Sequence, residues 1–595
     1  MSRPGPKSAT SAHALGAGAA PARPHGIVDE IGQAGSKSAL ARLNEAMAEI
    51  KALAVAPLIQ RALDAIRADD HKTATEFALK ALEQDDQSGF AWYVLGIARE
   101  KAGDFASSIS AYESALRLLP DHAEVANDLG RLAFRMGMHA QAEKLFIHFL
   151  ARHPDHVEAI NNLTCAVRAQ QRYEEAIEVL RPALLRTPEN SMLWNTMGSV
   201  VAEQGDYATA SIFFKEAVQL DPGFFKARYN LGNCLLMLGE TQAALDACDA
   251  ALSEVVAENE RQMMHMARAT MLAGLGRLGE AWDEYECRMH PDFSEVTYFV
   301  MRGPRWAPGM DLKGKTLLVL GEQGLGDEIL FANVLGDVLE DLGPDGKLMI
   351  AVEKRLVQLF QRGFPQADVC GHITGVLRLR PARTVPDTVD VSGVDMWTPM
   401  ASLLRAYRRK VADFPARPAN IAADPERVEA WGRRLADLPG RKIGILWKSN
   451  ITKDARHRYF AGFEAWEPVL RQEGVTFVNL QYGDCAAELA EAKARFGVDI
   501  WQPPGVDLKQ ELDEVAALCG AVDLTIGFSN ATFNIAAAMG APSWLITVPG
   551  SWPRLGLPDS YAWYPQVRVF GLDRFGDWAP VMCRVGEALG ELARG

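Results

Sequence analysis

Apolar and small residues recur with a period of 34 in the first half of the chain. Pro120, Pro154, Pro188 and Pro222 end successive segments. Within each segment the apolar spacing predicts two antiparallel helices, which small residues allow to cross closely and which proline ends. One such hairpin cannot bury its apolar face alone, so a stacked superhelix is predicted over residues 41–289. One equivalent position of the repeats holds the apolar residues Leu95, Leu129, Leu163, Met197 and Leu231. Another holds the small residues Ser108, Ala142, Ala176, Ala210 and Ala244.

This pattern resembles the tetratricopeptide repeat, whose first helices line a concave groove. A carboxamide offers both a donor and an acceptor, so a row of asparagines on these helices can bind the backbone of an extended peptide. The alternative is that they solvate the helix surfaces or pair with one another. The candidate acceptor-protein-binding residues are Asn127, Asn161, Asn162, Asn195, Asn230 and Asn233.

A different pattern begins near residue 312, where short apolar runs are followed by polar or glycine-rich turns and helical stretches. Such runs are typical of buried parallel strands in a doubly wound α/β fold. We predict two Rossmann-like lobes, at 312–420 and 421–595, after a linker at 290–311. Residues 1–40 are rich in Ala, Gly, Pro and Ser, which predicts a disordered arm or, alternatively, a transit peptide.

The turn after the first apolar run contains Gly324, Gly326 and Asp327. Glycines let a phosphate or sugar approach the backbone at the start of the following helix. Asp327 can be read in two ways, as a helix cap or as a general base for an acceptor hydroxyl.

Polar and basic residues follow the strands predicted in the second lobe. A loop after 441–447 concentrates positive charge that would suit an anionic leaving group, although a solvated basic loop is the alternative. The later run Ser-Asn-Ala-Thr opens a small-residue helix, where free backbone N–H groups favour a phosphate; a plain N-cap explains only one of its residues. The donor-binding candidates here are Lys448, Ser449, Asn450, Arg458, Gln481, Ser529, Asn530, Ala531, Thr532 and Asn534.

Composition and charge argue against several classes of function. The formal net charge of −14 argues against a nucleic-acid partner. No apolar run reaches membrane-spanning length, and the cysteine spacing forms neither a zinc set nor a disulfide framework, so we expect a cytoplasmic protein. No Asp-x-Asp triplet is present in the second half, which predicts chemistry without a metal or a cofactor. We leave open whether the chain forms a homo-oligomer.

The turn containing Asp327 and the segment around Asn534 resemble those of bacterial GT-B glycosyltransferases with two Rossmann-like lobes, including heptosyltransferases. With the repeats, the chain resembles the bacterial flagellin glycosyltransferases that load pseudaminic acid. The resemblance implies Asp327 as base, flagellin as acceptor, and inverting transfer from a nucleotide sugar to Ser or Thr. A histidine is common in the family where Asn534 stands, which favours a CMP-linked donor. The alternatives are a UDP-sugar enzyme, as in O-GlcNAc transferase, and a non-catalytic flagellin scaffold or chaperone.

Overall fold

The computed structural model describes residues 26–417, 420–449 and 456–594. They form two compact units, Met1–Ala166 and Val167–Gly595, so the division falls inside the repeat array rather than at residue 289. The first unit contains α1 (Gly26–Arg67), α2 (His71–Gln84), α3 (Gly89–Lys101), α4 (Phe105–Leu118), α5 (Ala123–Arg135), α6 (His139–Leu150) and most of α7 (Val157–Arg168).

Helix α1 begins inside the segment predicted to be disordered. Residues 26–40 are helical, whereas residues 1–25 lie outside the described residues. The prolines that favoured disorder all precede Gly26, which explains why the helix can start there. The predicted boundary at residue 40 is therefore not a boundary of the structure.

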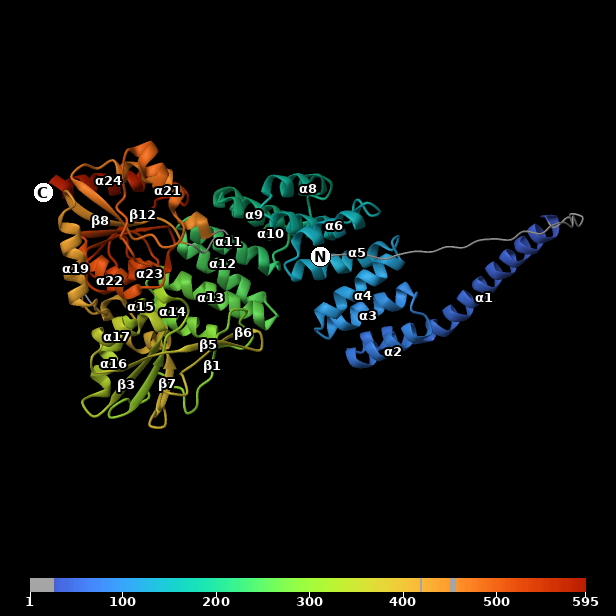
Figure 1. The fold of residues 1–595 in the computed structure, drawn as a ribbon, viewed down its shortest axis with the longest axis horizontal. Helices are drawn as coiled ribbons and strands as arrows, with labels where there is room; N and C mark the ends of the chain where they lie inside the picture. The colour runs from blue at the N-terminus through green and yellow to red at the C-terminus, as the bar shows by residue number, and fades with distance from the viewer. Residues whose placement is uncertain (1–25, 418–419, 450–455, 595) are drawn as a thin grey trace, which may run out of the picture. The chain divides into compact units, whose positions relative to one another are not determined.

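The repeats continue in the second unit as regular helix pairs (Figure 1), which confirms the predicted solenoid. Its four predicted prolines all lie shortly after the end of a second helix. The helices are α8 (Tyr173–Arg186), α9 (Ser191–Gln204), α10 (Tyr207–Leu220), α11 (Phe225–Met237), α12 (Thr241–Glu254), α13 (Glu258–Gly274) and α14 (Leu278–Tyr285), followed by the 3₁₀ turn η1 (Glu286–Met289).

A four-stranded parallel sheet of order β4-β3-β2-β7 forms the first α/β lobe. Its strands are β2 (Thr316–Leu320), β3 (Lys347–Val352), β4 (Asp368–Gly371) and β7 (Met396–Pro399), and its helices are α15 (Leu325–Phe331), α16 (Leu335–Leu342), α17 (Val357–Gly363) and α18 (Leu404–Tyr407). A small second sheet consists of β1 (Tyr298–Phe299), β6 (Arg380–Thr384) and β5 (Ile373–Leu377).

The segment predicted as a linker, 290–311, is built into this lobe. Strand β1 pairs with β6, and Arg305 forms a bridge with Trp397 of β7. Trp306 is buried in the core, so the segment gains apolar burial that its Pro-rich composition did not suggest.

A five-stranded parallel sheet of order β12-β11-β10-β8-β9 forms the second α/β lobe. On β8, Ile443 and Ile445 pack on one face with Leu589 of α24, whereas Leu446 packs on the other with Phe533 of α23. Helices α22 and α24 thus cover opposite faces (Figure 1). The elements are β8 (Arg441–Leu446), β9 (Val475–Asn479), β10 (Leu524–Phe528), β11 (Ser543–Thr547), β12 (Val567–Gly571), α19 (Pro425–Ala436), α20 (Glu467–Leu470), α21 (Ala486–Glu491), α22 (Leu512–Ala521), α23 (Ala531–Ala538) and α24 (Trp578–Arg594).

The close crossing of the repeat helices generates a stability prediction. A Cβ at Gly198 would lie 2.8 Å from a ring carbon of buried Phe214, so Gly198→Ala forces the ring to move. We expect it to destabilise the second unit by about 1–3 kcal/mol, measured as a lower thermal midpoint.

Gly432→Ala is the matched control, since this helical glycine of α19 has no heavy atom of the described chain within 4 Å of the added Cβ. Alanine should stabilise the helix there by up to about 1 kcal/mol. Equal midpoints for the two variants would contradict the packing argument.

Candidate functional site

The first turns of α15 and α23, one from each α/β lobe, lie in direct contact. A Cβ at Gly326 would stand 3.2 Å from Asn534 Nδ2 and 3.6 Å from the Ala531 backbone nitrogen. The lobes therefore approach closely at a position where the first supplies only backbone. Gly326, Ala531 and Asn534, predicted as donor-binding residues, are brought together in the structure.

Asp327 stands in this first turn and is half-buried. Its Oδ2 accepts a hydrogen bond from the backbone N–H of Gly324 at 3.0 Å, and Gly324 is the N-cap residue of α15. Of the two interpretations of Asp327, the capping one is thus matched by a hydrogen bond in the structure. Its role as a base stays a prediction.

At the start of α23, Asn530 is the N-cap, and its Oδ1 accepts the backbone N–H of Phe533 at 3.0 Å. Asn534 Nδ2 donates to the Asn530 carbonyl, also at 3.0 Å. Ser529 is exposed, whereas Thr532 is buried. Capping therefore accounts for Asn530, and the remaining polar groups stay candidates for ligand contacts.

One cation of the basic loop after β8 is paired. Lys448 Nζ forms an ion pair with Glu488. Gln481, which is 1% exposed, accepts the backbone N–H groups of Trp447 and Lys448 at 3.0 and 2.9 Å. Gln481 thus shapes the loop, which continues through Ser449. Asn450 lies outside the described residues.

Arg458 contacts the repeats. Its guanidinium donates to the Ala202 carbonyl at 3.2 Å and to the Tyr173 hydroxyl at 3.0 Å. The sequence predicted Arg458 as a donor-binding residue because it follows the basic loop. Tertiary packing instead gives it partners on α8 and α9. A contact with the donor stays a prediction.

The predicted acceptor-binding asparagines lie half-buried on the first helices of their repeats. In the second unit, Asn230 Nδ2 donates to Asn195 Oδ1 at 2.9 Å, so these two pair with one another, as the alternative interpretation expected. Asn233 is close enough to Tyr229 to lower the pKa of that phenol, against the larger rise due to burial. In the first unit, Asn127 Oδ1 is buried and accepts no hydrogen bond from the described residues.

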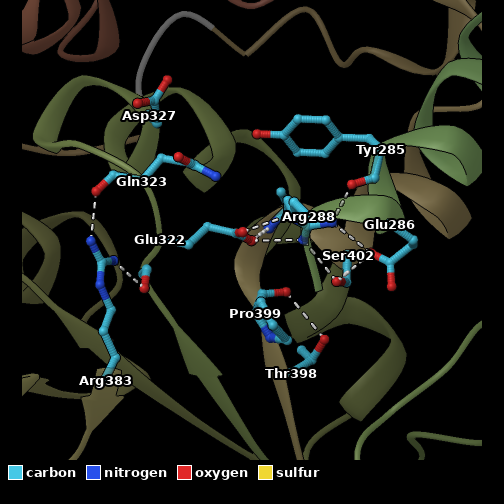
Figure 2. A network of polar contacts seen from close by, with 12 residues as sticks. Tyr285, Glu286, Arg288, Glu322, Gln323, Asp327, Arg383, Thr398, Pro399 and Ser402 are labelled. Carbon is cyan, nitrogen blue, oxygen red and sulfur yellow. Dashed lines mark hydrogen bonds and ion pairs between the residues drawn. The ribbon is translucent and has the colours of Figure 1, made fainter. Parts of the chain in front are cut away.

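A buried ion network joins the end of the repeats to the turn that carries Asp327 (Figure 2). Arg288 of η1 donates to both carboxylate oxygens of Glu322, at 2.6 and 3.0 Å, and these two residues are 3% and 2% exposed. Arg288 also bonds Glu286 at 2.7 Å and Ser402 at 2.9 Å. Glu322 in turn accepts the backbone N–H of Ala401 at 2.6 Å. Buried charges require such complete pairing.

A second arginine holds the same turn from the other side. Arg383 of β6 donates to the carbonyl of Gln323 at 2.6 Å (Figure 2), to the carbonyl of Gly321 at 2.5 Å and to the buried carboxylate of Glu328 at 3.0 Å. Neither arginine was predicted from the sequence. The available signal was a pair of glutamates, Glu322 and Glu328, beside an otherwise apolar strand, where unpaired charge would be costly.

The described residues contain no group of three or more His, Cys, Asp or Glu side chains placed to hold a metal ion. Among the described helices, none combines the length and the apolar character that crossing a membrane requires.

Comparison with known proteins gives the family. Protein FlbA of Caulobacter vibrioides is 48% identical over 577 residues, which are 97% of this chain and 96% of FlbA. The chain belongs to the FlbA family. The similarity to FlbA thus spans the α/β lobes as well as the repeats.

Tetratricopeptide-repeat family models match residues 59–123, 99–164, 162–223 and 201–265. The BBSome complex member bbs-4 of Caenorhabditis elegans is 30% identical over 138 residues, 23% of this chain and 30% of that protein. A tetratricopeptide repeat protein from Parabacteroides merdae is a solved structure with 15% identity and a TM-score of 0.36, covering 39% of this chain and 91% of its own.

The buried network generates a pH prediction. Burial alone would raise the pKa of Glu286, but Arg288, Arg305 and the Ser402 hydroxyl outweigh it and hold the pKa at about 2. A lowered pKa stabilises the fold above the unfolded value near 4.5, and that stabilisation is lost as pH falls toward 2. Glu286→Gln should lower the thermal midpoint at pH 6.5, from a contribution of up to about 3 kcal/mol. The gap to the wild type should narrow at pH 3.5.

Glu429→Gln is the control, because that carboxylate is 73% exposed in its pair with Arg433 and should contribute little at either pH. A gap for Glu286→Gln that is the same at both pH values would contradict the assignment.

Proposed function

We propose that this member of the FlbA family is a protein O-glycosyltransferase of the GT-B type that acts in the cytoplasm. Its repeats bind flagellin, and its two lobes transfer a nonulosonic acid of the pseudaminic type from a CMP-sugar to Ser or Thr, with inversion and without a metal. The observation that carries the proposal is the contact between α15 and α23 at Gly326. Ligands of open α/β sheets bind beyond the carboxyl ends of the strands, and here both lobes present those ends at one place.

The two lobes have different roles in the reaction at this junction. The acceptor hydroxyl oxygen forms a bond to the anomeric carbon while the bond from that carbon to the phosphate oxygen breaks. Asp327 takes the hydroxyl proton, and the phosphate leaves with the electron pair. The first-turn backbone N–H groups of α23, with Ser529 beside them, stabilise the charge on the phosphate.

The repeats supply the acceptor. Amide side chains on first helices suit an extended peptide segment, and tethering flagellin raises the effective concentration of its hydroxyls near the junction. In the second unit the last repeats share an apolar core with both lobes, so a bound acceptor is held on the same rigid body as the donor site.

A non-catalytic flagellin scaffold is the second candidate, and it is favoured by the capping contact of Asp327 with Gly324. In that case Asp327 holds the turn and transfers no proton. The two candidates make opposite predictions for one conservative variant.

Asp327→Asn separates the roles, because asparagine keeps an oxygen for the Gly324 N–H but cannot take a proton. We expect the thermal midpoint of this variant to stay near that of the wild type. Transfer should fall by about 10²–10⁴-fold, the range for loss of a general base. Transfer is measured with purified flagellin and CMP-sugar by intact mass, and binding of both ligands by calorimetry.

Asp327→Ala is the matched control, since it removes the cap as well and should also lower the midpoint, by about 1 kcal/mol. Undiminished transfer by Asp327→Asn would refute the base, and absence of transfer by the wild type would support the scaffold.

The acceptor is tested in cells. Flagellin isolated from a strain that lacks this protein should be lighter, by a whole number of nonulosonic acid residues, than flagellin from a complemented strain. Intact-mass spectrometry measures the difference. The Asp327→Asn variant provides the control for complementation, and an unchanged flagellin mass would refute flagellin as the acceptor.

A further inference from the structure

Two tyrosine hydroxyls are buried next to the lobe junction without a hydrogen-bond partner among the described residues. Tyr561 and Tyr564 lie in the segment before β12, are 2% and 0% exposed, and have ring centroids 5.9 Å apart. Buried phenols usually find a partner, because an unsatisfied buried polar group costs about 1–3 kcal/mol. Two such groups side by side point to a ligand that completes them.

The tyrosines belong to the neighbourhood of the candidate site. Burial is the main cause that raises the pKa of both phenols, and the Asp327 carboxylate adds to the rise for each. The exposed Ser529 hydroxyl is close enough to Tyr561 to lower its pKa, but without hydrogen-bond geometry. Trp563, which stands between the two tyrosines in the sequence, has its ring centroid 6.1 Å from that of Phe331 of α15, and both tyrosines share a buried apolar core with Phe533 of α23. The segment that carries the pair therefore packs against α15 and shares the core that contains α23.

Asn534 adds a third buried and unsatisfied atom, and its orientation is determined. Its Nδ2 donates to the Asn530 carbonyl, so Oδ1 is the atom left over, and this oxygen has no partner within the described part of the chain. The residue is 4% exposed and touches Gly326 across the junction.

An amide oxygen can only accept a hydrogen bond, and a phosphate diester near neutral pH has no proton to donate. Asn534 Oδ1 therefore suits a hydroxyl or an amide N–H of the ligand and does not suit its phosphate. A phenol hydroxyl can both donate and accept a hydrogen bond, and each hydroxyl of a sugar can do the same, so the two kinds of group suit one another.

We propose that Tyr561, Tyr564 and Asn534 form a subsite for the transferred sugar, in which Asn534 accepts from a sugar hydroxyl or acylamino N–H. The inference rests on the proposed glycosyltransferase function and deepens it. In the first turn of α23, the backbone N–H groups then face the phosphate, and the Asn534 side chain faces the sugar. This assignment narrows the donor-binding role predicted for Asn534 to the sugar part of the donor.

The test compares a sugar nucleotide with its nucleotide alone, on the full-length chain. Calorimetry measures binding of CMP-N-acetylneuraminic acid and of CMP, with UDP-N-acetylglucosamine and UDP as a second pair. Tyr561→Phe and Tyr564→Phe each remove one hydroxyl that has no partner among the described residues, so the thermal midpoint should not fall. Each should weaken binding of the preferred sugar nucleotide by about 3- to 10-fold, the value of one neutral hydrogen bond, and leave nucleotide binding unchanged.

Tyr407→Phe is the control, because its hydroxyl donates to Asp341 at 2.7 Å elsewhere in the first lobe. It should lower the midpoint slightly and change neither affinity. Equal weakening of sugar nucleotide and nucleotide, or no change in either, would overturn the subsite while the glycosyltransferase proposal stands. Failure of the wild type to bind any of the sugar nucleotides would overturn both.

Discussion

One apolar core joins the last repeats of the second unit to both α/β lobes, and the contact between α15 and α23 at the candidate site depends on it. The core runs from Leu235 and Trp282 in the last repeats, through Leu317 of β2, to Phe533 of α23. Because apolar burial is the main stabilising term in folding, repeats and lobes that share a core fold as one body. This explains why the last repeats group with the lobes, so that the compact units do not divide where the sequence pattern changes.

Buried ion pairs determine the path of backbone that the apolar core leaves unspecified. Arg288 and Glu322 are buried where the apolar contacts alone would not specify the path of the turn after β2. A buried ion pair is weak evidence for stability, since desolvation offsets much of its attraction, but a pair with every donor used has one geometry. Arg383 bonds the carbonyls of the same turn, so that the helix of Asp327, which begins at Leu325, starts from a backbone held on two sides.

The junction of the lobes combines three kinds of group in one small region. Gly326 contributes close approach, the start of α23 contributes oriented N–H groups, and Asn534 with the two tyrosines contributes hydrogen-bonding atoms without a partner among the described residues. Proteins rarely bury polar atoms without partners, so each such atom calls for an explanation. In the basic loop after β8, Lys448 is paired with Glu488.

The sequence by itself determined the elements whose signal is local. The 34-residue period predicted the repeats because each hairpin packs on its neighbour, and apolar runs predicted the first strand of each lobe, β2 and β8, because a buried strand needs consecutive apolar residues. Only tertiary structure decided which distant residues meet. Gly326 and Asn534 are neighbours across more than 200 positions, Arg458 reaches the repeats, and Arg288 finds Glu322. Periodicity cannot encode such pairs, because their partners are chosen by how whole lobes pack.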